Sequence, residues 1–135
     1  SLADIDMQIN ATIEVDDDIE RVLNKYRPMA AFTLGAMGSP KTNFYNAAYS
    51  RAGWEDMSKR VQSLWASGDK AAAVQAVEDD FLLSIYMIGS EAMVADRIRA
   101  AKAAGINTLR LAPVGRTSTD MIENLERIML LVSSI

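Results

Sequence analysis

Hydrophobic and polar residues alternate strictly near the amino terminus of the chain. From Ile5 to Val15 every odd-numbered residue is apolar and every even-numbered residue is polar. A period of two over this length predicts a β-strand with one apolar and one polar face. A similar alternation from Ile106 to Ala112 predicts a second strand. The pattern therefore provides two strands, one near each end of the chain.

The residues after the first strand have the spacing of helices. Asp16–Asp18 supplies an N-cap and an acidic first turn, and apolar residues then recur every three or four positions. Pro28 is expected to kink or interrupt this helix, which leaves Met29–Met37 as a second apolar segment. At Ser39–Pro40 a serine cap is followed by a proline, so a new helix is predicted to begin there and to stop at Gly53.

Most of the remaining chain is also predicted to be helical. Further helices are expected at Trp54–Ser67, after an Asp69 cap, at Asp79–Ile88, at Glu91–Ala104 and from about Thr119 to Ser133. Phe81–Ile88 can also form a strand, because short apolar runs are ambiguous. A helix, Gly105, a strand, a loop and a helix follow one another in the αβα order of a parallel fold. We predict a mostly helical α/β fold, with residues 1–135 in a single domain.

The number of strands limits this prediction. Two strands separated by about ninety mostly helical residues cannot form a stable sheet alone. A closed eight-stranded α/β barrel takes roughly 250 residues. The chain is therefore either a helical domain with a small sheet or a part of a barrel. In isolation, its open strand edges would invite pairing with a second copy. Ser1, in place of a methionine, suggests a piece cut from a longer protein.

Composition excludes several kinds of site. The chain has no cysteine and no histidine, so disulfides, thiolate or imidazole metal ligands and serine–histidine pairs are excluded. A cation site made of carboxylates alone remains open, but the sequence has no loop signature for one, so we predict no metal site. Its net charge is −4 without a basic run, so we expect no nucleic-acid partner. No apolar run approaches the roughly 20 residues of a membrane helix. Without a secretory or transit signal, a cytoplasmic location is expected.

Several segments together resemble a known family. Phe32–Ser39, Asn43–Tyr45 and Arg51–Glu55 look like the luciferase-like monooxygenase superfamily, and more narrowly like the oxidoreductases that use the deazaflavin coenzyme F420. Ile88–Ser90, which opens a helix, and Ala103–Leu109 are similar to that family's final helix and last barrel strand. The resemblance covers nearly the whole chain, in the order and spacing of the family.

This resemblance implies a fold and an activity. The family has a (β/α)8 TIM barrel with a long helical insertion and works as dimers, so the chain would be the carboxyl-terminal portion of such a barrel. Met7–Val15 would be a late strand, Leu34–Val77 the insertion, and Leu109–Pro113 the carboxyl end of the last strand. Members transfer hydride between coenzyme F420 and a small organic substrate, or use reduced FMN with oxygen.

The family's amino-terminal part, which supplies much of the coenzyme pocket and the catalytic residues, is not in this sequence. We therefore assign no catalytic residue. We expect this chain to bind no coenzyme and to turn over no substrate unaided.

Binding residues are expected near the middle of the chain. Gly35, Met37 and Gly38 form either a flexible wall for substrate or coenzyme, or a helix end and turn. Lys41 and Asn43 lie near a predicted helix start, where free N–H groups and a cation can meet a phosphate or carboxylate. The alternative for both is a solvated helix start.

Other candidates are divided between binding and packing. Tyr45 either lines a pocket with Phe44 or lies in the core. Gly115 and Arg116 follow the last strand, where many barrels hold phosphate, although Arg116 can also be an ordinary exposed cation. Polar packing is favoured over catalysis for Asn10 and Thr12. A core or dimer face is predicted for Ile122, Leu125, Ile128, Met129 and Val132.

Two functions compete. The first is an enzyme fragment, in which a deazaflavin or flavin does the redox chemistry and the protein positions it. The second is a non-catalytic helical oligomerisation or binding domain that pairs its strands across a homodimer or higher homo-oligomer.

Overall fold

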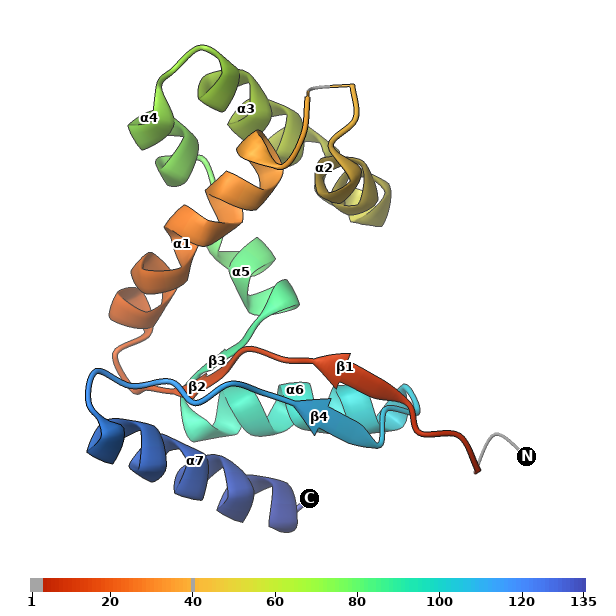
Figure 1. Cartoon of the computed structure of the whole chain (residues 1–135), viewed down its shortest axis with the longest axis vertical. Coiled ribbons are helices and arrows are strands. Elements are labelled where there is room, and N and C mark those ends of the chain that lie inside the picture. The colour runs from red at the N-terminus through yellow and green to blue at the C-terminus, as the bar shows by residue number, and fades with distance from the viewer. Residues whose placement is uncertain (1–3, 40) are drawn as a thin grey trace. The chain divides into compact units, whose positions relative to one another are not determined.

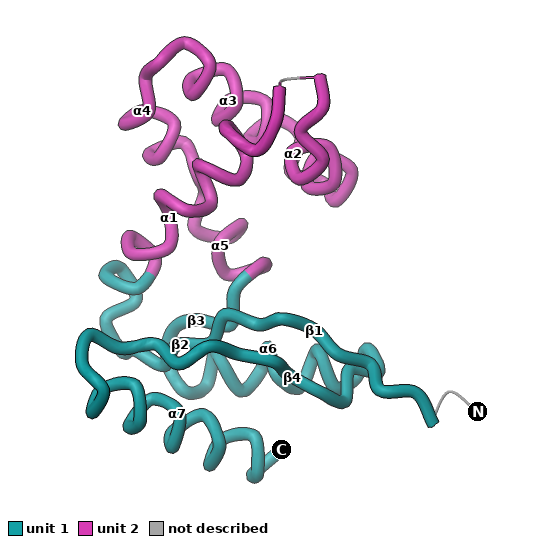
Figure 2. Tube along the Cα trace, viewed as in Figure 1, with its two compact units in different colours: residues 1–22, 86–135 teal, residues 23–85 magenta. Residues whose placement is uncertain are grey.

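The computed structural model describes residues 4–39 and 41–135 and divides the chain into two compact units (Figure 2). Unit 1 comprises the described part of residues 1–22 together with residues 86–135, and unit 2 comprises residues 23–85. Among the described residues, unit 1 holds the four strands, the last two helices and the start of the first helix, whereas unit 2 is helical.

The strands of unit 1 form two parallel pairs. β1 (Gln8–Asn10) pairs with β4 (Thr108–Arg110), and β2 (Ile13–Val15) pairs with β3 (Met87–Gly89). The predicted first strand is thus two short strands, because the segment changes its partner from β4 to β3 across Ala11 and Thr12. Parallel pairing agrees with the predicted α/β class.

β3 and β4 lie on opposite edges of the amino-terminal segment. The odd-numbered residues bond toward β4, because Ala11 N–H donates to the Arg110 carbonyl at 2.8 Å. The even-numbered residues bond toward β3, because the Thr12 carbonyl accepts from Met87 N–H at 2.9 Å. The amino-terminal segment is therefore the central strand of unit 1, although β3 and β4 are consecutive in the chain.

Two helices cover the apolar side of these strands. They are α6 (Glu91–Ala103), which passes behind the strands in Figure 1, and α7 (Ser118–Ser133). The core of unit 1 joins odd-numbered strand residues to both helices, and its buried members are Ile13, Val15, Met87, Val94, Ile98 and Ile128. Ile9, Ala11, Leu109 and Leu111 pack against it. The strict alternation in the sequence therefore selects the face that the helices cover.

The predicted helix starts in unit 1 are confirmed. Ser90 caps α6 by accepting from the Met93 N–H, as its position before Glu91 suggests. Thr117 and Asp120 form a capping box at the start of α7, in which each side chain accepts from the other residue's backbone N–H.

In unit 2, a single helix passes through Pro28. α1 (Ile19–Ala36) begins in unit 1 and continues without a break, so the predicted interruption at Pro28 is wrong. Leu23, Ala30 and Leu34 lie on one helical stripe and are buried. Burial of this stripe on both sides of the proline offsets the missing backbone hydrogen bond.

The next helix starts later than predicted. α2 (Phe44–Tyr49) is capped by Asn43, whose side chain accepts from the Asn46 N–H, so the predicted start at Ser39–Pro40 is wrong. Ser39 belongs instead to a turn closed by the Thr42 N–H at 2.9 Å, and Pro40 lies outside the described residues. Tertiary contacts of Asn43, described below, favour the later start.

The other helices of unit 2 follow in sequence. A π-helical segment (Ser50–Trp54) leads through Gly53, with φ 101°, into α3 (Glu55–Ala66), which confirms the predicted stop at Gly53. α4 (Lys70–Gln75) has the predicted Asp69 cap. α5 (Asp79–Ile85) is shorter than predicted, because β3 begins at Met87. Pairing with β2 draws the end of this ambiguous apolar run into a strand.

Candidate functional site

The Gly35–Tyr45 segment connects α1 to α2 within unit 2. Gly38 has φ 106°, a left-handed conformation that glycine adopts without strain. The Ser39 and Thr42 hydroxyls lie 2.8 Å apart across the turn that follows. The part of this segment that the structure describes is therefore a helix end and a tight turn.

Asn43 has a structural role at the centre of this segment. The residue is 4% exposed, and its Oδ1 accepts from the Asn46 N–H at 2.9 Å. Its Nδ2 donates to the Leu34 carbonyl at 2.9 Å and to the Thr33 carbonyl at 3.2 Å. Those carbonyls belong to the last turn of α1, which has no intrahelical donors left. Asn43 thus caps α2 and α1 together, and its polar atoms face the protein.

Gly35 provides space for an aromatic ring. A Cβ atom at this position would lie 2.5 Å from both Cβ and Cγ of Trp65. Phe32 meets the same ring edge-on, with centroids 5.8 Å apart. The glycine is therefore required by the close packing of α1 on α3.

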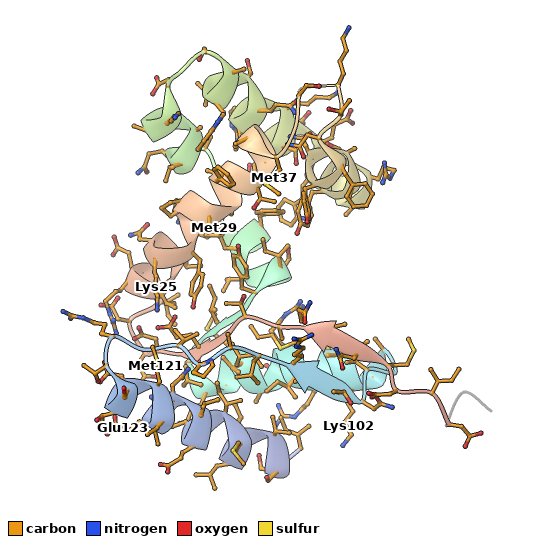
Figure 3. The ribbon with its side chains drawn as sticks, in the orientation of Figure 1. Lys25, Met29, Met37, Lys102, Met121 and Glu123 are labelled. Atoms are coloured by element: carbon orange, nitrogen blue, oxygen red, sulfur yellow. The ribbon has the colours of Figure 1, made fainter. Side chains whose placement is uncertain are left out.

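The other predicted residues of this segment are exposed. Met37, Lys41 and Tyr45 all lie at the surface, and Tyr45 packs edge-on against Phe44 with ring centroids 5.9 Å apart. Met29 and Met37, labelled in Figure 3, are 60% and 41% exposed. Unit 2 therefore presents apolar side chains to solvent near the end of α1 and the start of α2.

Gly115 and Arg116 precede α7 in unit 1. A Cβ atom on Gly115 would lie 2.5 Å from the Met121 nitrogen, so the loop packs directly on the first turn of α7. The Arg116 and Thr117 N–H groups donate to the Asp120 carboxylate at 3.1 and 3.0 Å. The hydrogen bond with the Thr117 side chain, followed by these backbone bonds, lowers the pKa of Asp120. The amides expected to meet a phosphate thus bind an internal carboxylate.

A shallow hollow of about 510 Å³ lies over β1 and β4 in unit 1. Asn10, Thr12, Arg110 and Ala112 line it together with Ala11 and Leu111. Asn10 and Arg110 are direct neighbours in the parallel register. The structure therefore gathers polar side chains where these two strands end. Sequence reasoning considered Asn10 and Thr12 but missed Arg110, although the alternation from Ile106 to Ala112 places it on the polar face.

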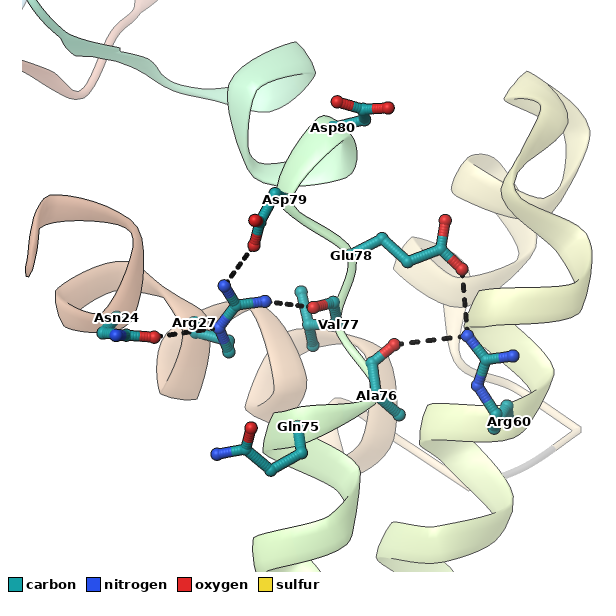
Figure 4. Close-up of a pocket in the computed structure, with 9 residues that line it drawn as sticks. All are labelled: Asn24, Arg27, Arg60, Gln75, Ala76, Val77, Glu78, Asp79 and Asp80. Carbon is teal, nitrogen blue, oxygen red and sulfur yellow. Dashed lines mark hydrogen bonds and ion pairs between the residues drawn. The ribbon is translucent and has the colours of Figure 1, made fainter. Parts of the chain in front are cut away.

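A larger polar hollow of about 810 Å³ lies within unit 2 (Figure 4). Arg27 bonds the Val77 carbonyl and the Asp79 carboxylate. Arg60 approaches the Ala76 carbonyl at 3.5 Å and bonds Glu78 at 2.9 Å. Two guanidinium groups thus hold the connection between α4 and α5. Their donors serve the fold, which makes this hollow a poor candidate for catalysis.

An apolar groove of about 660 Å³ lies between α6, β4 and α7 in unit 1. Its lining includes Ile98, Leu109, Ile128, Met129 and Val132. From the predicted stripe on α7, Ile128 is buried, whereas Ile122, Met129 and Val132 are 57%, 67% and 43% exposed. One side of α7 therefore belongs to the core, and the other side is open.

The predicted binding residues remain apart from these hollows. None of the eight residues (Gly35, Met37, Gly38, Lys41, Asn43, Tyr45, Gly115 and Arg116) lines any of the three. Six of them lie in unit 2 and two in unit 1. Among the described residues, no helix has the length and apolar character needed to cross a membrane.

Comparison with known proteins identifies related sequences. Residues 1–108 match the family model described as luciferase-like monooxygenase. Over 109 residues the chain is 26% identical to a Mycobacterium tuberculosis protein provisionally named a coenzyme F420-dependent oxidoreductase. The match covers 81% of this chain but 31% of the relative, so the chain spans about a third of the relative's length. The family match ends at β4, before α7.

Proposed function

Because the chain belongs to the luciferase-like monooxygenase family, we propose that it is the carboxyl-terminal part of an oxidoreductase that transfers hydride between coenzyme F420 or FMN and a small organic substrate. The observation that carries this proposal is the family match over residues 1–108. The name of the mycobacterial relative favours the deazaflavin. The relative's greater length supports the view that further protein is needed for activity.

The parallel strands of unit 1 support the proposal that they belong to a larger sheet. Parallel sheets are normally covered on both faces, because their crossover connections place helices there. In unit 1, α6 and α7 pack on the odd-numbered side chains, while Gln8, Asn10 and Arg110 on the other side are exposed. In a barrel, that polar side would face the interior. The carboxyl ends of its strands would then contribute to the active site.

The residues of this chain fit a coenzyme only in part. The Asn43 amide and the Arg116 N–H are bonded internally, which leaves Met37, Lys41 and Tyr45 as exposed wall residues. The bound coenzyme would supply the redox chemistry. We propose that this chain contributes walls around it, and that its remaining contacts come from preceding protein. The isolated 135-residue chain is therefore expected to be inactive.

A fluorescence titration tests this proposal. The 135-residue chain and the full-length product of its gene are each titrated with coenzyme F420 and with FMN. Binding by the full-length product, with little or none by this chain, is expected. Tight binding by the 135-residue chain would refute the incomplete pocket. A full-length product that binds neither compound would refute the oxidoreductase function.

We also propose that copies of the chain associate through α7. Met129 and Leu130 are 67% and 73% exposed, and apolar helix faces of this kind commonly mark interfaces. This observation also favours the second candidate function, an oligomerisation domain without catalysis. Light scattering is expected to give a dimer or larger species, which Leu130→Glu shifts toward monomer. A folded monomer of the unmodified chain would exclude this association.

A further inference from the structure

We propose that the hollow over β1 and β4 is a binding site for an oxyanion, a carboxylate or phosphate group of a small organic ligand, with Arg110 as its principal contact. This site goes beyond the coenzyme proposal, because it requires neither deazaflavin nor flavin. It is formed by residues of unit 1 alone.

Arg110 has donors available. It lines the hollow and is exposed, and among the described residues its guanidinium makes no hydrogen bond or ion pair. By contrast, Arg27, Arg60 and Arg127 are each bonded to a carboxylate. A guanidinium presents several N–H groups in a planar fork that matches two oxygens of a carboxylate or phosphate. The geometry of this side chain therefore favours an oxyanion.

The neighbouring strand adds neutral polar groups. Asn10 lies beside Arg110 in the register, at the roughly 4.8 Å spacing of paired strands. Thr12 is two residues further along, on the same face. The amide of Asn10 and the hydroxyl of Thr12 can each donate a hydrogen bond. One cation and two neutral donors therefore border the same hollow.

Carboxylates on this face are displaced from the arginine. Asp6 accepts from the Thr108 hydroxyl, and Thr108 precedes Arg110 by two residues, about 7 Å along β4. Glu14 lies four residues beyond the register partner of Arg110, about 13 Å along the strand. Between these acids the face carries a single positive charge. A volume of about 510 Å³ suits a small organic anion.

NMR titration of the 135-residue chain tests the site. Inorganic phosphate and acetate are added separately at constant ionic strength, and the Arg110 side-chain Nε–H and the backbone N–H signals are followed. We expect saturable shifts at Arg110 and at Asn10, Ala11 and Thr12. A response to phosphate alone assigns a phosphate-bearing ligand, and a response to acetate as well extends the site to carboxylates. Saturable shifts confined to other residues, or none, would overturn the proposal.

Charge-matched variants separate the arginine fork from net charge. Arg110→Gln is expected to weaken binding at least about tenfold, and Arg110→Lys to give an intermediate loss, because lysine keeps the charge without the fork. Arg99→Gln removes one positive charge on the outer side of α6, where Arg99 pairs with Asp96, and is expected to leave the affinity unchanged. Equal losses in Arg110→Gln and Arg99→Gln would refute a specific site. The titration contains no coenzyme, so its result is independent of the coenzyme proposal.

Discussion

The double cap at Asn43 gives a sharp test of whether this residue serves the fold or a ligand. In Asn43→Ala, α2 loses its N-cap, a change that typically costs about 1 kcal/mol. The Thr33 and Leu34 carbonyls also lose a buried donor, for about 1 kcal/mol more. The cost of losing this donor stays near the lower limit of its usual range, because Asn46 Nδ2 still donates to the Leu34 carbonyl at 3.1 Å. The expected total is about 2 kcal/mol.

Asn43→Asp separates the acceptor function of this side chain from its donor function. A carboxylate keeps the acceptor for the Asn46 N–H but directs negative charge at two carbonyl oxygens in a buried place. We expect a loss of about 3 kcal/mol or more at pH 7. Burial and the carbonyl dipoles raise the pKa of the introduced carboxyl above its unfolded value near 3.9. The folded state then binds the proton more tightly, so the variant becomes more stable relative to the wild type as the pH falls from 7.

Urea unfolding followed by circular dichroism at pH 7 and pH 5 measures these losses. Asp69→Ala is the matched control, because Asp69 is an exposed N-cap in the same unit that accepts from the Ala72 N–H at 3.0 Å. It should cost about 1 kcal/mol. If Asn43→Ala costs no more than this control, the hydrogen bonds from Asn43 to the Thr33 and Leu34 carbonyls do not stabilise the fold. The ligand role considered from the sequence would then regain support.

Two further predictions concern residues that the sequence suggested as ligand contacts or their neighbours. Gly35→Ala should destabilise unit 2 by about 1–2 kcal/mol in urea unfolding, because the added methyl lies 2.5 Å from the Trp65 side chain. The same change should alter the near-ultraviolet circular dichroism of Trp65. An unchanged stability would show that the α1–α3 contact is loose. Thr117→Ala should raise the pKa of Asp120 toward its ordinary value, measured by carboxyl NMR titration, because the bond that lowers it most is removed. Since the folded pKa of Asp120 is lowered, its contribution to stability is lost as the pH falls through that pKa, and a normal pKa in the wild type would contradict the capping box.

Local signals in the sequence predicted the helix boundaries that depend on adjacent residues. Ser90 and Asp69 stand directly before helices, and both accept from a backbone N–H three residues later. Gly53 ends a helix where its left-handed conformation is needed. In these cases the bond that fixes the boundary lies within one turn, so a single sequence is sufficient.

Boundaries fixed by distant partners were not predictable in this way. Ser39–Pro40 has a good local start signal, but Asn43 gains bonds to two carbonyls nine and ten residues earlier. Those added bonds favour a start at Phe44. Pro28 is tolerated inside α1 for a similar reason, because burial of the helix face outweighs a local rule. In both places tertiary contacts decide what the local pattern leaves open.

The same difference between local patterns and tertiary contacts applies to the candidate sites. Alternation places Asn10 and Thr12 on one polar face, and the register of β1 and β4 makes Asn10 a direct neighbour of Arg110, which sequence reasoning missed. Alternation does not show that the face is hollowed, because that depends on which strands become neighbours. The positions Gly35 and Gly115 were identified through glycine, yet each lacks a side chain because another part of the protein packs against it. Glycine alone does not distinguish approach by a ligand from approach by a helix.

The order of the strands carries a consequence for the proposed enzyme. In an eight-stranded barrel consecutive strands lie side by side, so β4 would pair with β3. In the structure β4 pairs with β1, on the opposite edge of the amino-terminal segment from β3. If the chain functions within a barrel, β4 must therefore exchange its partner when the preceding strands are present. Leu109 and Leu111 can stay on the helix-covered side through this exchange, because the alternation belongs to the strand and not to its neighbour. Arg110 would then remain on the polar side, but Asn10 would no longer lie beside it.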